Sequence, residues 1–268
     1  MIIFDGLYSL ISLVLTMITL YINKFMAKKE LDKFPFGKYI LEPLIISVKS
    51  LAIVAMCLYS LLGAVKDMIN GGNAVEFGFA IVYSIVSVVG CGLIYIYMNK
   101  KGNKISSELI KVEANQWLMD TLLSLGVLVG FLIAMALRNT RFSMINNYID
   151  PIMVIVVSVI FIKFPMESFI NSFKEILCFK ADDEINDDIC LVVKEIEKEY
   201  NFQDSISRVT KVGGELRIEI DFIYDKESKF KNLDQMDCVR EEVYNAIKHI
   251  NYKKWLNISF TGDRKWAI

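Results

Sequence analysis

The chain has 268 residues, of which 54% are hydrophobic and 23% charged, with 30 Lys and Arg against 31 Asp and Glu. Its mean hydropathy of +0.41 is too high for an ordinary globular protein of this length. The balanced charge argues against a nucleic-acid-binding surface, which needs a surplus of basic residues. The composition therefore indicates a membrane protein.

Histidine and cysteine are too scarce for several kinds of metal site. The chain has one histidine, His249, which excludes a cage of several histidines. Its five cysteines are an odd number without a CxxC pair, so neither a disulfide framework nor a thiolate zinc site is indicated. The sequence also lacks intact Walker, dinucleotide-loop and HExxH motifs.

Five apolar runs predict membrane-spanning helices, each of which needs about 20 apolar residues. The predicted spans are residues 2–22, 44–65, 77–98, 117–137 and 151–162, the last extending toward residue 169. The five runs themselves contain few charged residues, namely Asp5, Lys49 and Asp120, and the extension of the last run begins with Lys163. A secretory signal is disfavoured, because the first run is too long and no basic segment precedes it.

Lysines concentrate in two of the predicted loops. Residues 23–40 contain Lys24, Lys28, Lys29, Lys33 and Lys38, and residues 99–112 contain Lys100, Lys101, Lys104 and Lys111. Basic loops stay on the cytoplasmic side of a membrane. We therefore expect these loops and the polar tail in the cytoplasm, which puts the N-terminus of a five-span protein outside.

From about Phe179 the composition changes to that of a soluble domain. Apolar residues at helical spacing predict helices around residues 185–200 and 236–250. Alternating residues predict strands around 206–212, 216–224 and 256–260, with a hairpin turn at Gly213 and Gly214. The sequence thus predicts an α-helical polytopic membrane domain over residues 1–178 and an α+β domain of order α-β-β-α-β over residues 179–268.

Polar residues in two predicted spans share one helix face. An ionisable group in hydrocarbon costs on the order of 3 kcal/mol, so it usually faces a partner or a water-filled path. Asp5 and Ser9 are four residues apart, as are Gln116 and Asp120. Two such pairs form a four-oxygen site, whose two carboxylates match a divalent cation and also accept protons. Alternatively, Ser9 bonds its own helix backbone and Asp5 is an interfacial residue.

The other charged features have structural interpretations. Lys49 is expected to pair with a carboxylate of a neighbouring helix rather than to take part in transport. The acidic run at residues 182–188 is explained by helix capping and solvation. His249 is interpreted as a solvated helix residue.

Four segments, in this order, resemble the cation diffusion facilitator family: FDGLYSLISL, KFPFGKYILEPL, VEANQWLMDTLLS and YIDP. The tail is similar to that family's cytoplasmic dimerisation domain, which is ferredoxin-like or metallochaperone-like. The resemblance implies a transporter and not an enzyme. It further implies a homodimer in the plasma or inner membrane that exports a divalent metal cation in exchange for protons by alternating access, with no cofactor and no nucleic-acid partner.

The resemblance also implies a metal site. The family takes an i, i+4 pair from each of two helices, and by position these residues are Asp5, Ser9, Gln116 and Asp120, with protons loading onto the two aspartates. The family's histidine positions hold no histidine here, and Ser9 stands at a carboxylate position. An oxygen-only set favours Mn²⁺ or Mg²⁺ over Zn²⁺, with Fe²⁺ and Co²⁺ as further candidates. The family's multi-histidine tail cluster is not expected, because the tail has only His249.

The family has six spans with both ends in the cytoplasm, and this chain begins where the second span is expected. Either the true start lies upstream, or the chain is a shortened member without the first helix. A shortened member suggests an alternative function, a non-transporting membrane scaffold or regulator of the same fold. An intramembrane aspartyl protease is disfavoured, because a GxGD-type sequence is absent.

Overall fold

The protein is described here from a computed structural model, which covers residues 14, 16–22, 24–26, 32–72, 77–105, 108–137, 146–229 and 232–267. The chain divides into two compact units. The membrane unit consists of Met1–Lys29 and Leu44–Ser172, and the tail unit of Glu30–Pro43 and Phe173–Ile268. Most of the first predicted span lies outside the described residues, although its residues 16–22 are helical.

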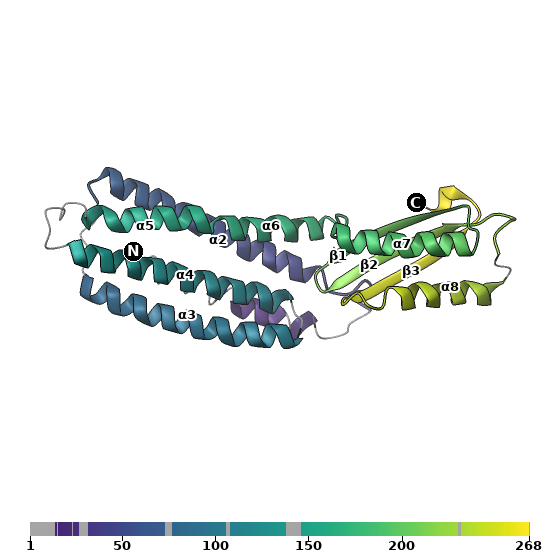
Figure 1. Cartoon of the computed structure of the whole chain (residues 1–268), viewed down its shortest axis with the longest axis horizontal. Helices are drawn as coiled ribbons and strands as arrows, with labels where there is room; N and C mark the ends of the chain where they lie inside the picture. The colour runs from purple at the N-terminus through teal and green to yellow at the C-terminus, as the bar shows by residue number, and fades with distance from the viewer. Residues whose placement is uncertain are drawn as a thin grey trace. The chain divides into compact units, whose positions relative to one another are not determined.

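Long apolar helices build the membrane unit (Figure 1). They are α2 (Leu41–Ile69), α3 (Phe77–Ile105), α4 (Glu108–Leu137), α5 (Asn146–Phe161) and α6 (Lys163–Ile176). A helix satisfies its own backbone hydrogen bonds, as the bilayer interior requires. Within the described part of the chain, four stretches are long and apolar enough to cross a membrane: Leu41–Ile69, Ile81–Gly102, Glu113–Ile133 and Asn147–Ile176. They correspond to the second to fifth predicted spans, and the total of five stays a prediction.

Helix α4 packs against α3 on one side and α5 on the other. Two glycines, Gly126 and Gly130, lie one turn apart on its α5 side. A Cβ atom at Gly130 would lie 2.9 Å from Met153 Cγ, and one at Gly126 would lie 3.5 Å from Val157 Cγ2. Small residues at this spacing let two membrane helices approach closely. The close approach of α4 and α5 therefore depends on glycine, which has no side chain, at position 130.

The tail unit has the predicted α-β-β-α-β order, which is confirmed (Figure 1). Its elements are α7 (Asp183–Glu199), β1 (Asp204–Val212), β2 (Glu215–Ile223), α8 (Leu233–Ala246) and β3 (Lys253–Thr261). The sheet order is β1-β2-β3, with β1 antiparallel and β3 parallel to the central strand. The comparison with a ferredoxin-like fold stays a prediction.

The core of the tail unit lies between this sheet and the two helices. Fully buried apolar side chains come from every layer, including Ile189 of α7, Ile218 and Phe222 of β2, and Val243 of α8. Phe222 stacks on Phe202, with the ring centroids 4.7 Å apart. The alternation of apolar and charged residues in β2 thus places one side of the strand in this core.

His249 lies in the turn after α8 and not on the helix itself, so this part of its interpretation is wrong. Its Nε2 atom lies 2.7 Å from Asp188 Oδ2, and its Nδ1 atom lies 2.9 Å from the Ala246 carbonyl oxygen. The side chain is 61% exposed. It therefore links the end of α8 to α7 at the surface of the tail unit.

The segment before α2 also belongs to the tail unit. The Phe36 carbonyl accepts a 3.0 Å hydrogen bond from Arg217 of β2, and the Phe36 ring lies 5.8 Å from that of Trp255 in β3. Lys253 Nζ donates to the Tyr39 hydroxyl at 2.8 Å. This part of the first basic loop is thus held against the sheet.

Candidate functional site

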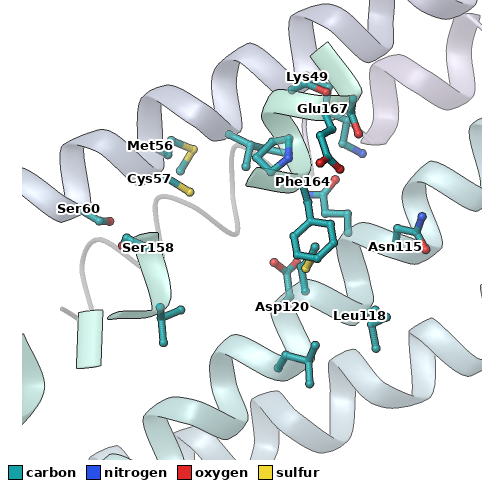
Figure 2. Close-up of a pocket in the computed structure, with 18 of the residues that line it drawn as sticks. Lys49, Met56, Cys57, Ser60, Asn115, Leu118, Asp120, Ser158, Phe164 and Glu167 are labelled. Carbon is teal, nitrogen blue, oxygen red and sulfur yellow. The ribbon is translucent and has the colours of Figure 1, made fainter. Parts of the chain in front are cut away.

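A cavity of about 440 Å³ lies within the membrane unit, lined by residues of α2, α4, α5 and α6 (Figure 2). Polar side chains line it although it lies among apolar helices. The most relevant are Lys49, Asn115, Gln116, Asp120, Ser158 and Glu167. Polar groups inside a membrane usually mark a path for an ion or another substrate.

Two of the four predicted site residues, Gln116 and Asp120, lie in the wall of this cavity. Both are on α4, one helical turn apart, and both side chains are half-buried. The other two predicted residues, Asp5 and Ser9, lie outside the described residues. The structure therefore brings one i, i+4 pair to the cavity, and the complete four-residue set stays a prediction.

The facing wall comes from α2 and adds groups that sequence reasoning did not assign to a site. Met56, Cys57 and Ser60 line the cavity from this helix (Figure 2). Met119 lines it from α4. A cysteine in a membrane span is ordinarily a small apolar packing residue, whereas Cys57 belongs to the cavity wall. The cavity thus combines oxygen atoms with several sulfur atoms, which are softer ligands.

The third wall comes from α6. Figure 2 shows Phe164 projecting into the cavity, and Glu167 lines it from the next turn. Glu167 lies 3.7 Å from Lys163 in an i, i+4 pair whose side chains are largely exposed. Among the described lining residues, the charged ones are Lys49, Asp120 and Glu167. Two carboxylates and one ammonium thus line the cavity, and one of these carboxylates, Glu167, also has Lys163 beside it.

Lys49 pairs with Glu113 of α4, which confirms that it meets a carboxylate of a neighbouring helix. The two side chains are 4% and 6% exposed. The second Glu113 oxygen, Oε2, accepts a 3.4 Å hydrogen bond from Thr16. Sequence reasoning missed Glu113, because the fourth span was taken to begin at Trp117. Its spacing from Gln116 (three residues) and from Asp120 (seven) was the available signal.

The described residues contain no group of three or more His, Cys, Asp or Glu side chains that is arranged to hold a metal ion. The role of Gln116 and Asp120 as metal ligands therefore stays a prediction.

A polar cavity with a carboxylate, enclosed by membrane-spanning helices, is typical of an ion transporter. Residues 1–177 match the family described as the cation efflux transmembrane domain. The chain therefore belongs to the cation efflux, or cation diffusion facilitator, family, as its motifs predicted, and it is a membrane cation transporter rather than an enzyme.

Two relatives are similar over much of the chain. The magnetosome protein MamB of Magnetospira sp. (strain QH-2) is 23% identical over 249 residues, which cover 92% of this chain and 81% of that protein. The manganese efflux system protein MneP of Bacillus subtilis (strain 168) is 25% identical over 163 residues, which cover 61% of this chain and 54% of that protein.

Proposed function

We propose that this protein exports a divalent metal cation in exchange for protons, by alternating access. The observation that carries the proposal is the position of Asp120, which lines a polar cavity inside the membrane unit together with Gln116, one turn away. A carboxylate in that position holds a metal when ionised and carries a proton when the metal has left. One residue thereby serves both transported species.

Asp5 and Ser9 complete the proposed site as the second i, i+4 pair. The two aspartates supply two negative charges, which match one divalent cation. Release of the metal leaves both carboxylates ready to accept protons. This exchange keeps the charge inside the membrane close to balance in both halves of the cycle.

Mn²⁺ is the proposed substrate. Carboxylate, amide and hydroxyl oxygens suit Mn²⁺ and Mg²⁺ better than Zn²⁺, which prefers nitrogen and sulfur ligands. The name of the relative MneP identifies it as part of a manganese efflux system. The sulfur atoms of Cys57, Met56 and Met119 keep Fe²⁺, Co²⁺ and Zn²⁺ as competitors to be measured beside it.

The tail unit is proposed to be the dimerisation domain, and the protein to act as a homodimer in the plasma or inner membrane. The lysine-rich loops support a cytoplasmic position for the tail. The contacts of residues 36 and 39 with β2 and β3 support the same assignment for the second half of the first basic loop, since residues 30–43 belong to the tail unit.

The test is metal-driven proton flux in proteoliposomes, comparing Mn²⁺, Mg²⁺, Fe²⁺, Co²⁺ and Zn²⁺. We expect flux that Asp120→Asn abolishes. The matched control is Asp150→Asn, which removes a carboxylate from α5 that does not line the cavity, and it should retain flux. Metal-driven flux that survives in Asp120→Asn contradicts the proposed site. No flux in the wild type, even from a chain extended by upstream codons, favours the scaffold alternative.

A further inference from the structure

The Lys49–Glu113 pair has one member in the wall of the cavity. Lys49 lines the cavity together with Gln116 and Asp120, whereas Glu113 is not among the lining residues and is nearly fully buried. The member of the pair that lines the cavity of the proposed substrate is therefore the lysine, and the carboxylate that it binds lies outside the lining.

Glu113 lies on the same face of α4 as the predicted ligands. It precedes Gln116 by three residues and Asp120 by seven, so the three side chains follow one another along the helix. Its carboxylate lies between α2 and the helical residues 16–22, bound by Lys49 through Oε1 and by Thr16 through Oε2. If the ammonium moved away, the Glu113 carboxylate would add a third oxygen-bearing side chain to Gln116 and Asp120, one turn earlier on the same face of α4.

We propose that the Lys49 ammonium is a tethered cation, which occupies Glu113 in the metal-free protein and yields that carboxylate to a divalent cation. The inference rests on the proposed transport function and adds Glu113 as a ligand and Lys49 as a specificity-determining residue. No covalent bond changes. The ammonium leaves Glu113, the metal takes its place, and the ammonium moves into the cavity toward the Glu167 carboxylate.

This exchange discriminates between ions by their charge. A monovalent ion offers Glu113 no more charge than the ammonium that it must displace, whereas a divalent ion offers twice as much. Because Lys49 is part of the chain, its ammonium also has a high effective concentration at Glu113, and a free ion has to compete with it for that carboxylate. Lys49 therefore excludes Na⁺ and K⁺ from the site while divalent metals pass.

The test is Mn²⁺ binding to the purified full chain in detergent, measured by isothermal titration in NaCl or choline chloride at about 0.15 M. Lys49→Met removes the tether, and we expect a Kd about tenfold lower in choline, with competition by Na⁺ that the wild type does not show. In Lys49→Arg, the guanidinium can donate two hydrogen bonds to the Glu113 carboxylate and is harder to displace, so we expect a Kd for Mn²⁺ about tenfold higher. Lys49→Met/Glu113→Gln should lose both the gain in affinity and the competition by Na⁺.

The variants separate the inference from the proposed function. Equal Kd values for the wild type, Lys49→Arg and Lys49→Met, with no effect of Na⁺, overturn the inference and leave the pair as a brace between helices. If Lys49→Met does not fold, the charge-conserving Lys49→Arg decides, and an unchanged Kd has the same meaning. Mn²⁺ binding that Asp120→Asn leaves intact contradicts the proposed function itself, whatever Lys49 does.

Discussion

The backbone amide of Gly214, in the β1–β2 turn, donates a 2.9 Å hydrogen bond to the carboxylate of Glu42, in the first turn of α2. The neighbouring amide of Gly213 donates a bond of the same length to Glu175, near the end of α6. Glu175 also lies 3.3 Å from Lys211 of β1. Within the tail unit, one hairpin turn is thus bound by carboxylates from the ends of two helices that continue into the membrane unit.

The first prediction concerns Gly213→Ala, which should loosen this contact. Gly213 has φ +58°, and an added Cβ would lie 2.7 Å from Glu42 Oε2 and 2.8 Å from the Tyr39 carbonyl oxygen. We expect a loss of about 1–2 kcal/mol from the left-handed backbone alone, before the clash is counted. The measurement is the midpoint of thermal unfolding of the full chain in detergent, with proteolysis of residues 30–43 as a second readout.

Gly214→Ala is the matched control for this change. Its added Cβ would lie 3.6 Å from Glu42 Oε2, an ordinary contact, and its φ is not positive. We therefore expect a midpoint close to that of the wild type. Equal midpoints for the two alanine variants would show that the turn does not hold the segment before α2.

The second prediction is a change of metal preference in Gln116→His. An imidazole beside Asp120 restores a nitrogen ligand, which suits Zn²⁺. We expect the ratio of Zn²⁺ to Mn²⁺ transport to rise about tenfold, the scale of one good ligand exchange. The measurement is competitive flux in proteoliposomes. Gln116→Asn, which keeps the amide but offers no imidazole, should leave the ratio unchanged, and a rise there would disprove the explanation.

The third prediction uses Cys57 as a reporter of the cavity. A variant that keeps Cys57 and has serine at the other four cysteine positions should react with a water-soluble maleimide, because Cys57 lines the cavity. Mn²⁺ should slow the reaction several-fold. A variant that keeps only Cys91 of α3, which is not in the lining, serves as the control. Equal protection of both thiols would mean that Mn²⁺ acts elsewhere.

The fourth prediction concerns the contact between α4 and α5. Gly130→Ala places a methyl group 2.9 Å from Met153 Cγ, so we expect a loss of about 1–3 kcal/mol from overpacking. Gly90→Ala of α3 is the control, since nothing lies within 4 Å of its added Cβ. The midpoints of thermal unfolding in detergent should separate the two variants, and identical midpoints would contradict the packing described here.

The fifth prediction is a late tyrosine titration in the tail unit. Burial, together with the 3.0 Å hydrogen bond from its hydroxyl to Glu242, raises the pKa of Tyr200 to about 12. Since an unfolded tyrosine has a pKa of about 10, the contribution of Tyr200 to folding is complete below pH 10 and is lost as pH rises toward 12. Ultraviolet difference titration of the wild type against Tyr200→Phe should show one group ionising above pH 11. In Glu242→Gln this ionisation should move to lower pH, and an unmoved titration would exclude Glu242 as a cause.

The elements of the tail unit followed directly from the sequence. The alternating residues of β2 and the Gly213–Gly214 turn predicted the strand and hairpin within a residue or two, because both signals are local. The start of β3 at Lys253 was missed by three residues. Lys253 and Lys254 look like loop residues, but Lys253 is held by Tyr39 and Glu215, which are distant in sequence.

The site was predicted less completely, for a related reason. The spacing of Gln116 and Asp120 was sufficient to place them on one face of α4. Glu113 looked like the end of a polar loop, because the charge partner that makes its buried position acceptable, Lys49, lies 64 residues earlier in the chain. The cavity-facing thiol of Cys57 had no sequence signal at all, because a cysteine in a span is ordinarily an apolar packing residue.

Glu42 and Lys49 are seven residues apart on the continuous helix α2, which corresponds to two turns and a rise of about 10 Å. The first is bound by the hairpin of the tail unit and the second by Glu113 of the membrane unit. Single mutations at Glu42 and Lys49 should therefore have additive effects on the midpoint of thermal unfolding, because the two side chains are well separated and have different partners.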